Sequence, residues 1–201
     1  MIEGHSGCEI LIKNGVVEKS SAGCYPIDRL QAQAEKQLAF SKISFEGVLI
    51  PEIYDTRKTN NSFVIEMEYL SCLNSIQYLN RASKEQLNTL AKILFKFIED
   101  NTENSEIVVI DFLDSFVESP IIDIAKIRQD TKHKWTTFIY AKHYDKNKIE
   151  ISLEYLDNKL DSMFQEFFFY KYYKLFQFMN LARILPYSRN QKTTDYLMKE
   201  I

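Results

Sequence analysis

The sequence predicts an α+β fold in which a small antiparallel sheet with one helix precedes a mainly helical region. Strand-like runs separated by turn residues fill residues 1–70, whereas apolar residues spaced three and four apart dominate residues 71–201. In addition, 45% hydrophobic residues in a chain of 201 are enough to bury a core. We therefore expect one compact domain, or one unit with two small lobes.

A β-hairpin is predicted near the start of the chain. Apolar, β-favouring residues in CEILIKNG and VVEKSS lie on either side of Asn14-Gly15. This dipeptide readily adopts the positive φ values that a tight hairpin turn requires. The pattern therefore predicts two antiparallel strands joined at these two residues.

One helix and two further strands complete the predicted sheet region. The stretch PIDRLQAQAEKQLAF offers Asp28 as an N-cap and places Leu30, Ala34 and Leu38 four residues apart, as on one face of a helix. The following VLIPEIYDTRKTNNSFVIEMEYL contains two strand candidates around a polar, Asn-rich turn. A small sheet with one helix on it is the expected result.

Helical signals dominate the remainder of the chain. Ser83 with a Gln three residues later forms a capping-box pattern, which predicts that a helix begins there. A second helix is expected to begin near Pro120. Pro186 interrupts the helical pattern before a short terminal helix in QKTTDYLMKEI. A third helix is predicted from an apolar repeat that spans about two heptads, too short for a coiled coil. Its apolar positions are Leu153, Leu156, Leu160, Met163 and Phe167.

Composition argues against several classes of partner. The 25 basic and 28 acidic residues give a net charge of −3, and no basic block is long enough to follow a phosphate backbone, so nucleic acid is not expected. Cys8, Cys24 and Cys72 form no CxxC pair, which fits a reducing cytoplasm. We expect no export, because MIEGHSGCEI shows no positive region followed by an apolar one, and no membrane span, because Lys171 and Lys174 interrupt the most apolar stretch. We expect a cytoplasmic protein with no membrane partner.

The stretch EIVVIDFLDSFVESPIIDIAKIR ends a hydrophobic strand on Asp111. In isolation, such an Asp would begin the following turn. However, a glycine pair at residues 4–7 precedes the first strand, Lys19 lies in the second, and Glu35 lies in the helix that follows. In kinases, a glycine-containing turn, a lysine, a glutamate and a later Asp follow one another along the chain in this order and together hold a nucleotide. Loop amides cover the phosphates, a lysine contacts phosphate oxygens, a carboxylate positions that lysine, and a later Asp binds magnesium.

These residues give the chain a family resemblance. It resembles the aminoglycoside phosphotransferase and choline kinase group of kinase-like small-molecule phosphotransferases. The matching stretches span nearly the whole chain: GHSGCEILI, VVEKSS, RLQAQAEKQ, FVIEMEYL, VVIDFLDSFVESPIIDIAKI and NLARILPY. The resemblance implies a protein-kinase-like two-lobed fold, with an antiparallel-sheet N-lobe in residues 1–70 and a mainly helical C-lobe in residues 71–201.

The resemblance also implies a site for ATP and magnesium. Lys19 would pair with Glu35, and the segment from Glu68 to Leu70 would offer backbone groups to the adenine. Asp123 would be a structural acid that anchors the catalytic loop. The implied nucleotide contacts are Gly4, Ser6, Gly7, Lys19, Glu35, Glu68 and Leu70, and the implied metal ligands are Asp111 and, as a second acidic contact, Asp114.

Simpler interpretations exist for the same residues. Lys19 and Glu35 could form a surface ion pair worth under about 1 kcal/mol, and Asp123 could be only a first-turn acid of its helix.

The catalytic loop of this group has no counterpart in the sequence. A His-Gly-Asp element followed by Asn is expected before Asp111, but only TENS separates the helix ending in FKFIEDN from the strand. A different alignment places Leu87 at the base position and Lys92 at the Asn position. None of the histidines, His5, His133 and His143, restores the pattern, so no catalytic residue is identified.

Two hypotheses follow from this combination. The first is an ATP-dependent phosphotransferase that acts on the hydroxyl of a small molecule. The second is a non-catalytic, pseudokinase-like module that binds nucleotide, or a partner protein through its C-terminal aromatic helices. Residues 164–178 contain six Phe and three Tyr, whose rings could face a cation but fit core packing better.

Overall fold

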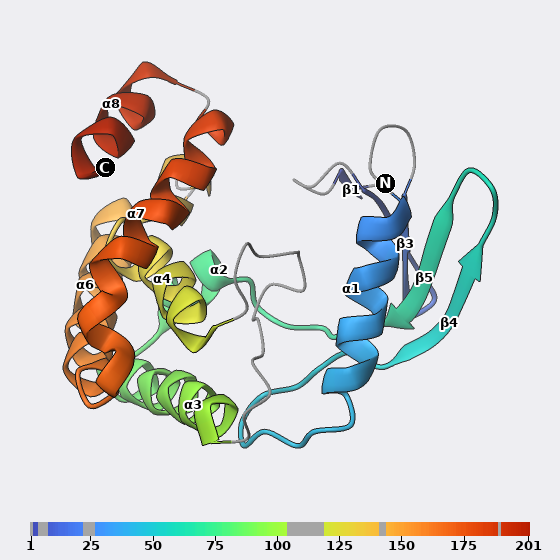
Figure 1. Ribbon diagram of the computed structural model, residues 1–201, viewed down its shortest axis with the longest axis horizontal. Helices are drawn as coiled ribbons and strands as arrows, with labels where there is room; N and C mark the ends of the chain where they lie inside the picture. The colour runs from blue at the N-terminus through green and yellow to red at the C-terminus, as the bar shows by residue number, and fades with distance from the viewer. Residues whose placement is uncertain (1, 4–7, 22–26, 104–118, 141–143, 189) are drawn as a thin grey trace. The chain divides into compact units, whose positions relative to one another are not determined.

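The computed structural model describes the chain except residues 1, 4–7, 22–26, 104–118, 141–143 and 189 (Figure 1). The described residues form two compact units, which divide between Cys72 and Leu73. We call them the sheet unit and the helical unit. The division lies two residues from the boundary expected at residue 70.

The sheet unit contains a five-stranded antiparallel sheet in the order β1-β2-β3-β5-β4. This sheet, and the single helix on it, confirm the α+β class and the small antiparallel sheet that the sequence predicts. The central strand β3 pairs with β2 on one side and β5 on the other. The strands are β1 (Ile2–Glu3), β2 (Glu9–Lys13), β3 (Val16–Ser20), β4 (Ile53–Lys58) and β5 (Phe63–Glu68).

The predicted hairpin turn joins β2 to β3. Asn14 has φ 51° and Gly15 has φ 78°, so both residues adopt the left-handed conformation of a two-residue hairpin turn. The flanking residues Lys13 and Val16 face each other in the ladder. The prediction from the Asn-Gly dipeptide is therefore confirmed.

Helix α1 (Ile27–Phe40) packs mainly on β4 and β5. The expected apolar face is correct for Leu30 and Ala34 but wrong for Leu38, which is exposed. At 100° per residue, Gln37 lies closer than Leu38 to the direction of Leu30, and its side-chain amide donates to the Pro51 carbonyl at 2.8 Å. The shared core consists of Cys8, Leu30, Ala34, Phe63 and Ile65.

The expected N-cap of this helix is also corrected. Asp28 lies in the first turn of α1, one residue after its first residue Ile27, and is therefore inside the helix. Its negative charge there still interacts favourably with the helix dipole. Residues 22–26, which precede the helix, lie outside the described part of the chain.

The helical unit is mainly helical, as predicted. The capping box at Ser83 is confirmed, because the Gln86 N–H donates to Ser83 Oγ at 3.2 Å and the Ser83 N–H donates to Gln86 Oε1 at 2.8 Å. The expected start at Pro120 is also confirmed. The helices are α2 (Ser75–Arg81), α3 (Lys84–Glu103), α4 (Pro120–Thr131), α5 (Trp135–Tyr140), α6 (Lys146–Phe164), η2 (Phe168–Tyr172), α7 (Tyr173–Ile184), η3 (Leu185–Tyr187) and α8 (Gln191–Glu200).

Two helix boundaries differ from the sequence-based expectation. The helical stretch from residue 120 breaks after α4, where Lys134 has φ 55° and Asp130 accepts a hydrogen bond from the Thr136 N–H at 2.9 Å. The predicted apolar repeat ends early, because α6 stops at Phe164 and Phe167 lies beyond it. Phe167 still packs in the unit, with its ring centroid 5.2 Å from that of Phe95.

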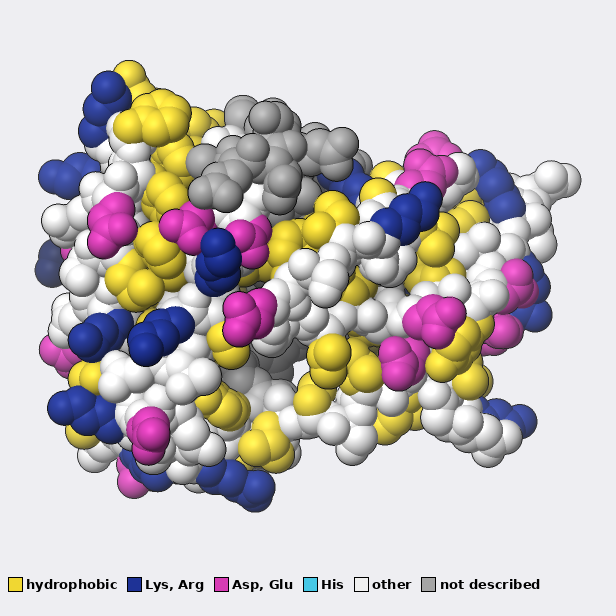
Figure 2. Space-filling view, turned by 90° about the horizontal axis from the view of Figure 1, so that it is seen from below, with side chains coloured by type: hydrophobic (Ala, Val, Ile, Leu, Met, Phe, Trp, Pro, Cys, Tyr) yellow, Lys and Arg dark blue, Asp and Glu magenta, His cyan; other side chains and the backbone are white. Residues whose placement is uncertain are grey.

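Hydrophobic side chains reach the surface of both units, interspersed with charged ones (Figure 2). None of the helices in the described residues has the length and apolar content that crossing a bilayer requires.

Candidate functional site

Lys19 occupies the middle of the sheet unit. It lies on the central strand β3, opposite Ile10 of β2 and Ile65 of β5. Its side chain points to the face of the sheet that carries α1, because Lys19 Nζ donates to Gln33 Oε1 at 2.8 Å. Gln33 is buried on α1. The ammonium group therefore has a neutral hydrogen-bond acceptor on the helix as one of its contacts.

The implied partner of this lysine, Glu35, lies elsewhere on the helix. Glu35 is exposed and accepts a hydrogen bond from Gln31 Nε2 at 2.8 Å. Two residues apart on a helix correspond to a rotation of about 200°, so Gln33 and Glu35 face nearly opposite directions. No ion pair joins Lys19 to Glu35 in the part of the chain that the structure describes. On α1, Gln33 contacts the lysine, and the sequence analysis did not single this residue out.

An open apolar row lies beside Lys19 on the same face of the sheet. Ile12, Val17 and Met67 are cross-strand neighbours on β2, β3 and β5. Because side chains two residues apart on a strand share a face, this row lies on the side of Lys19. Ile12 is 42% exposed, since α1 packs mainly on β4 and β5. The row is therefore open at Ile12, while Met67 at its other end packs against the core beneath α1.

The segment after β5 has its backbone donors largely occupied. The Glu68 N–H donates to the Glu52 carbonyl at 2.8 Å, and the Tyr69 N–H donates to the Gly15 carbonyl at 3.1 Å. Among the described residues, the Leu70 N–H donates to no acceptor. Of the amides expected to face an adenine, only that of Leu70 is available for a ligand.

The remaining implied ligands cannot be placed. Gly4, Ser6, Gly7, Asp111 and Asp114 lie outside the described residues. Within the described ranges, no group of three or more His, Cys, Asp or Glu side chains could hold a metal ion.

Asp123, the implied structural acid, is fully buried in the first turn of α4. A carboxylate at this position is favoured by the helix dipole.

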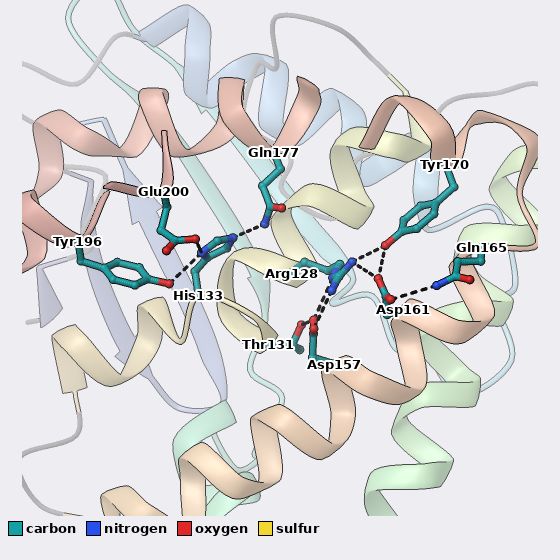
Figure 3. A network of polar contacts seen from close by, with 10 residues as sticks. All are labelled: Arg128, Thr131, His133, Asp157, Asp161, Gln165, Tyr170, Gln177, Tyr196 and Glu200. Carbon is teal, nitrogen blue, oxygen red and sulfur yellow. Dashed lines mark hydrogen bonds and ion pairs between the residues drawn. The ribbon is translucent and has the colours of Figure 1, made fainter. Parts of the chain in front are cut away.

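A buried ionic network joins α4 and α6 in the helical unit (Figure 3). Arg128 donates to both carboxylate oxygens of Asp157, at 2.9 and 2.7 Å, and Thr131 Oγ1 donates to the same carboxylate at 2.7 Å. The Arg128 guanidinium also contacts Asp161 and the Tyr170 hydroxyl. Burial alone would raise the pKa of Asp161, but the Tyr170 hydrogen bond and the Arg128 charge together lower it. Each of these groups bonds at least one other member of the network, which indicates a structural role.

A second polar cluster connects α8 to α7 and to the turn that follows α4 (Figure 3). The buried imidazole of His133 lies 3.0 Å from the Tyr196 hydroxyl through Nδ1, and its Nε2 contacts the Gln177 amide. Burial lowers the pKa of His133, and the charge of Lys132 lowers it further, although Glu200 opposes this shift. The sequence offers no local signal for either cluster, because their members are far apart along the chain.

Comparison with known proteins identifies no relative. No family model, no curated protein and no solved structure matches the chain. The functional argument therefore rests on the residues of the two units themselves.

Proposed function

We propose that the sheet unit binds ATP, and that the chain is a kinase-like phosphotransferase or a non-catalytic member of that class. The observation that carries the proposal is Lys19, on the central strand and oriented by the buried Gln33 beside an open apolar row. A lysine ammonium can bind phosphate oxygens, and an apolar row can accept the face of a base.

The spacing of these groups suits an extended nucleotide. Lys19 and Val17 are two residues apart on β3, or about 7 Å along the strand. Val16, at the end of β3, pairs with Glu68, and the available Leu70 amide lies two residues further on. A nucleotide could thus place its phosphates at Lys19, its base on the apolar row and the base edge at the Leu70 N–H.

The proposal assigns magnesium to Asp111 and Asp114, which the resemblance implies and which lie outside the described residues. A bound magnesium ion would neutralise charge on the phosphates. Gln33 orients Lys19 through a neutral amide oxygen. A general base typically contributes about 10²–10⁴-fold to rate, so its loss need not abolish nucleotide binding.

The test compares thermal unfolding with and without Mg-ATP. At about 100 times the Kd, a ligand adds roughly 2.7 kcal/mol of stability, which corresponds to a rise of roughly 11–22 °C in the transition of a unit as small as the sheet unit. The substitution Ile12→Glu should abolish this rise, because it places a charge in the apolar row.

A matched control lies next to it on the same strand. Leu11 is 44% exposed, nearly the same as Ile12, but its side chain points to the opposite face. Leu11→Glu should therefore leave the shift intact. Equal shifts for the two variants, or no shift of the unmodified protein at millimolar ATP, would contradict the proposed site.

The enzyme and the binding module differ in turnover. ADP release that depends on an added amino alcohol, sugar or aminoglycoside, and that Asp111→Ala abolishes, would identify the enzyme. If Mg-ATP binds but no acceptor stimulates ADP release, the chain is the binding module.

A further inference from the structure

Helix α7 buries polar side chains and exposes apolar ones. Its inner side contains Gln177 and Asn180, both buried, beside apolar residues. Its outer side contains Leu175, which is 58% exposed, and Phe178, which is also exposed. This arrangement departs from the usual surface helix, in which the apolar stripe faces the core and the outer side is polar.

Specific contacts fix this orientation of α7. Gln177 contacts the buried imidazole of His133, and Asn180 Nδ2 donates to Gln129 Oε1 at 2.8 Å. Rotating the helix to bury Leu175 would leave these polar groups without partners, at about 1–3 kcal/mol for each. The apolar outer side is therefore a stable feature of the helical unit.

The apolar outer side continues into η2 and includes two lysines. Phe168 is 81% exposed, Tyr172 is exposed, and Lys171 Nζ lies 5.0 Å from the centre of the Tyr172 ring. Lys174 is exposed next to Leu175. We call this surface the aromatic–cationic face, and it consists of Phe168, Lys171, Tyr172, Lys174, Leu175 and Phe178.

The charge of this region is opposite to that of the whole chain. The chain has a net charge of −3, but from Phe167 to Thr194 the sequence contains no Asp or Glu. The same stretch contains five cationic residues, namely Lys171, Lys174, Arg183, Arg189 and Lys192. The face itself contains Lys171 and Lys174 and no Asp or Glu, so an anionic partner that also accepts protruding apolar side chains complements it.

We propose that the aromatic–cationic face binds the surface of a bilayer that contains anionic phospholipid. Lysines next to such a surface bind its headgroups, while phenylalanine and leucine enter the boundary with the acyl chains and tyrosine remains at the interface. An acidic peptide would use the lysines but would not require Phe168 to project into solvent. The proposal revises the sequence-based expectation of no membrane partner, and it needs no membrane-spanning helix.

Co-sedimentation of the full chain with vesicles tests the proposal. We expect binding to phosphatidylcholine vesicles that contain about 30 mol% phosphatidylserine, and much weaker binding to phosphatidylcholine alone. Lys174→Ala should reduce partitioning by about fivefold, the effect of one cation near the surface. Leu175→Ser should reduce it by about tenfold through lost apolar burial.

The exposed face of α6 supplies matched controls. Ile151 is 68% exposed and Lys148 is exposed, so Ile151→Ser and Lys148→Ala remove similar side chains from another helix. Both variants should bind vesicles as the unmodified chain does. Equal binding to neutral vesicles, no binding to either kind, or loss of binding in both sets of variants would overturn the proposal. Binding that polyglutamate removes and Leu175→Ser leaves unchanged would also overturn it, and would indicate an acidic protein partner.

Discussion

Two arginines show how burial changes the contribution of an ion pair to stability. Arg128 and Arg57 each contact more than one carboxylate. The Arg128 side chain is only 6% exposed, whereas that of Arg57 is 53% exposed on the sheet. Water screens the exposed pairs, but the loss of Arg128 would leave the buried carboxylate of Asp157 without its cation.

This difference predicts unequal effects of the same substitution. Arg128→Gln should lower the free energy of unfolding by about 3–5 kcal/mol, because it leaves a buried charge uncompensated. Arg57→Gln should cost less than about 1 kcal/mol. Urea unfolding of the two variants measures both values. Similar values for both would show that the network around Arg128 contributes no more than a surface pair.

The candidate site was predictable from sequence only in part. The order of apolar and polar residues places Lys19 on a strand and Glu35 on the following helix, and both assignments are confirmed. Which helix residue reaches the lysine depends on the rotation of α1 against the sheet. That rotation is fixed by packing of Leu30 and Ala34 against Phe63 and Ile65, contacts that are remote in sequence. The buried Gln33 is consequently the partner.

At the scale of elements, α7 and the segment before it show that apolar composition alone does not predict which side chains are buried. The sequence favours core packing for the aromatic side chains of residues 164–178. This prediction is correct for Phe164 and Tyr173, which are buried. It is wrong for Phe168, Tyr172 and Phe178, which are exposed. The physical reason is that Gln177 and Asn180 have polar partners on neighbouring segments, His133 and Gln129, so the inner side of α7 does not require more apolar residues.

Helix α8 is expected to respond to pH through His133. Because burial lowers the pKa of this imidazole below its usual value of about 6.5, its contribution to stability is present above that pH. The contribution is lost as the pH falls below about 6.5 towards the lower pKa of the folded state, since the unfolded chain binds the proton more readily. We therefore expect His133→Phe to weaken the decrease in unfolding free energy between about pH 7 and pH 5.

Denaturant unfolding at each pH provides the measurement. Tyr196→Phe is the control, because it removes the hydroxyl that contacts Nδ1 and keeps the titrating ring. This variant should lose about 1 kcal/mol at neutral pH and retain most of the pH dependence. The same pH dependence in His133→Phe and in the unmodified chain would exclude His133 as its source.

Across the whole molecule, local signals predicted the elements better than their contacts. The Asn14-Gly15 turn, the capping box at Ser83 and the start at Pro120 depend on a few adjacent residues, and all are confirmed. The pairing of Arg128 with Asp157 joins residues 29 positions apart. No pattern within a short window encodes such a pairing, because it depends on how α4 and α6 pack.

The two units should unfold in separate steps, since each described unit has its own buried core. Trp135, the one tryptophan of the chain, packs against Leu181, Ile184 and Leu197 in the helical unit. Its fluorescence therefore follows that unit alone, whereas circular dichroism follows both. We expect Arg128→Gln to lower the fluorescence midpoint in urea, and Mg-ATP to raise only the transition that fluorescence does not detect. Coincident transitions that shift together under both changes would show that the units unfold as one.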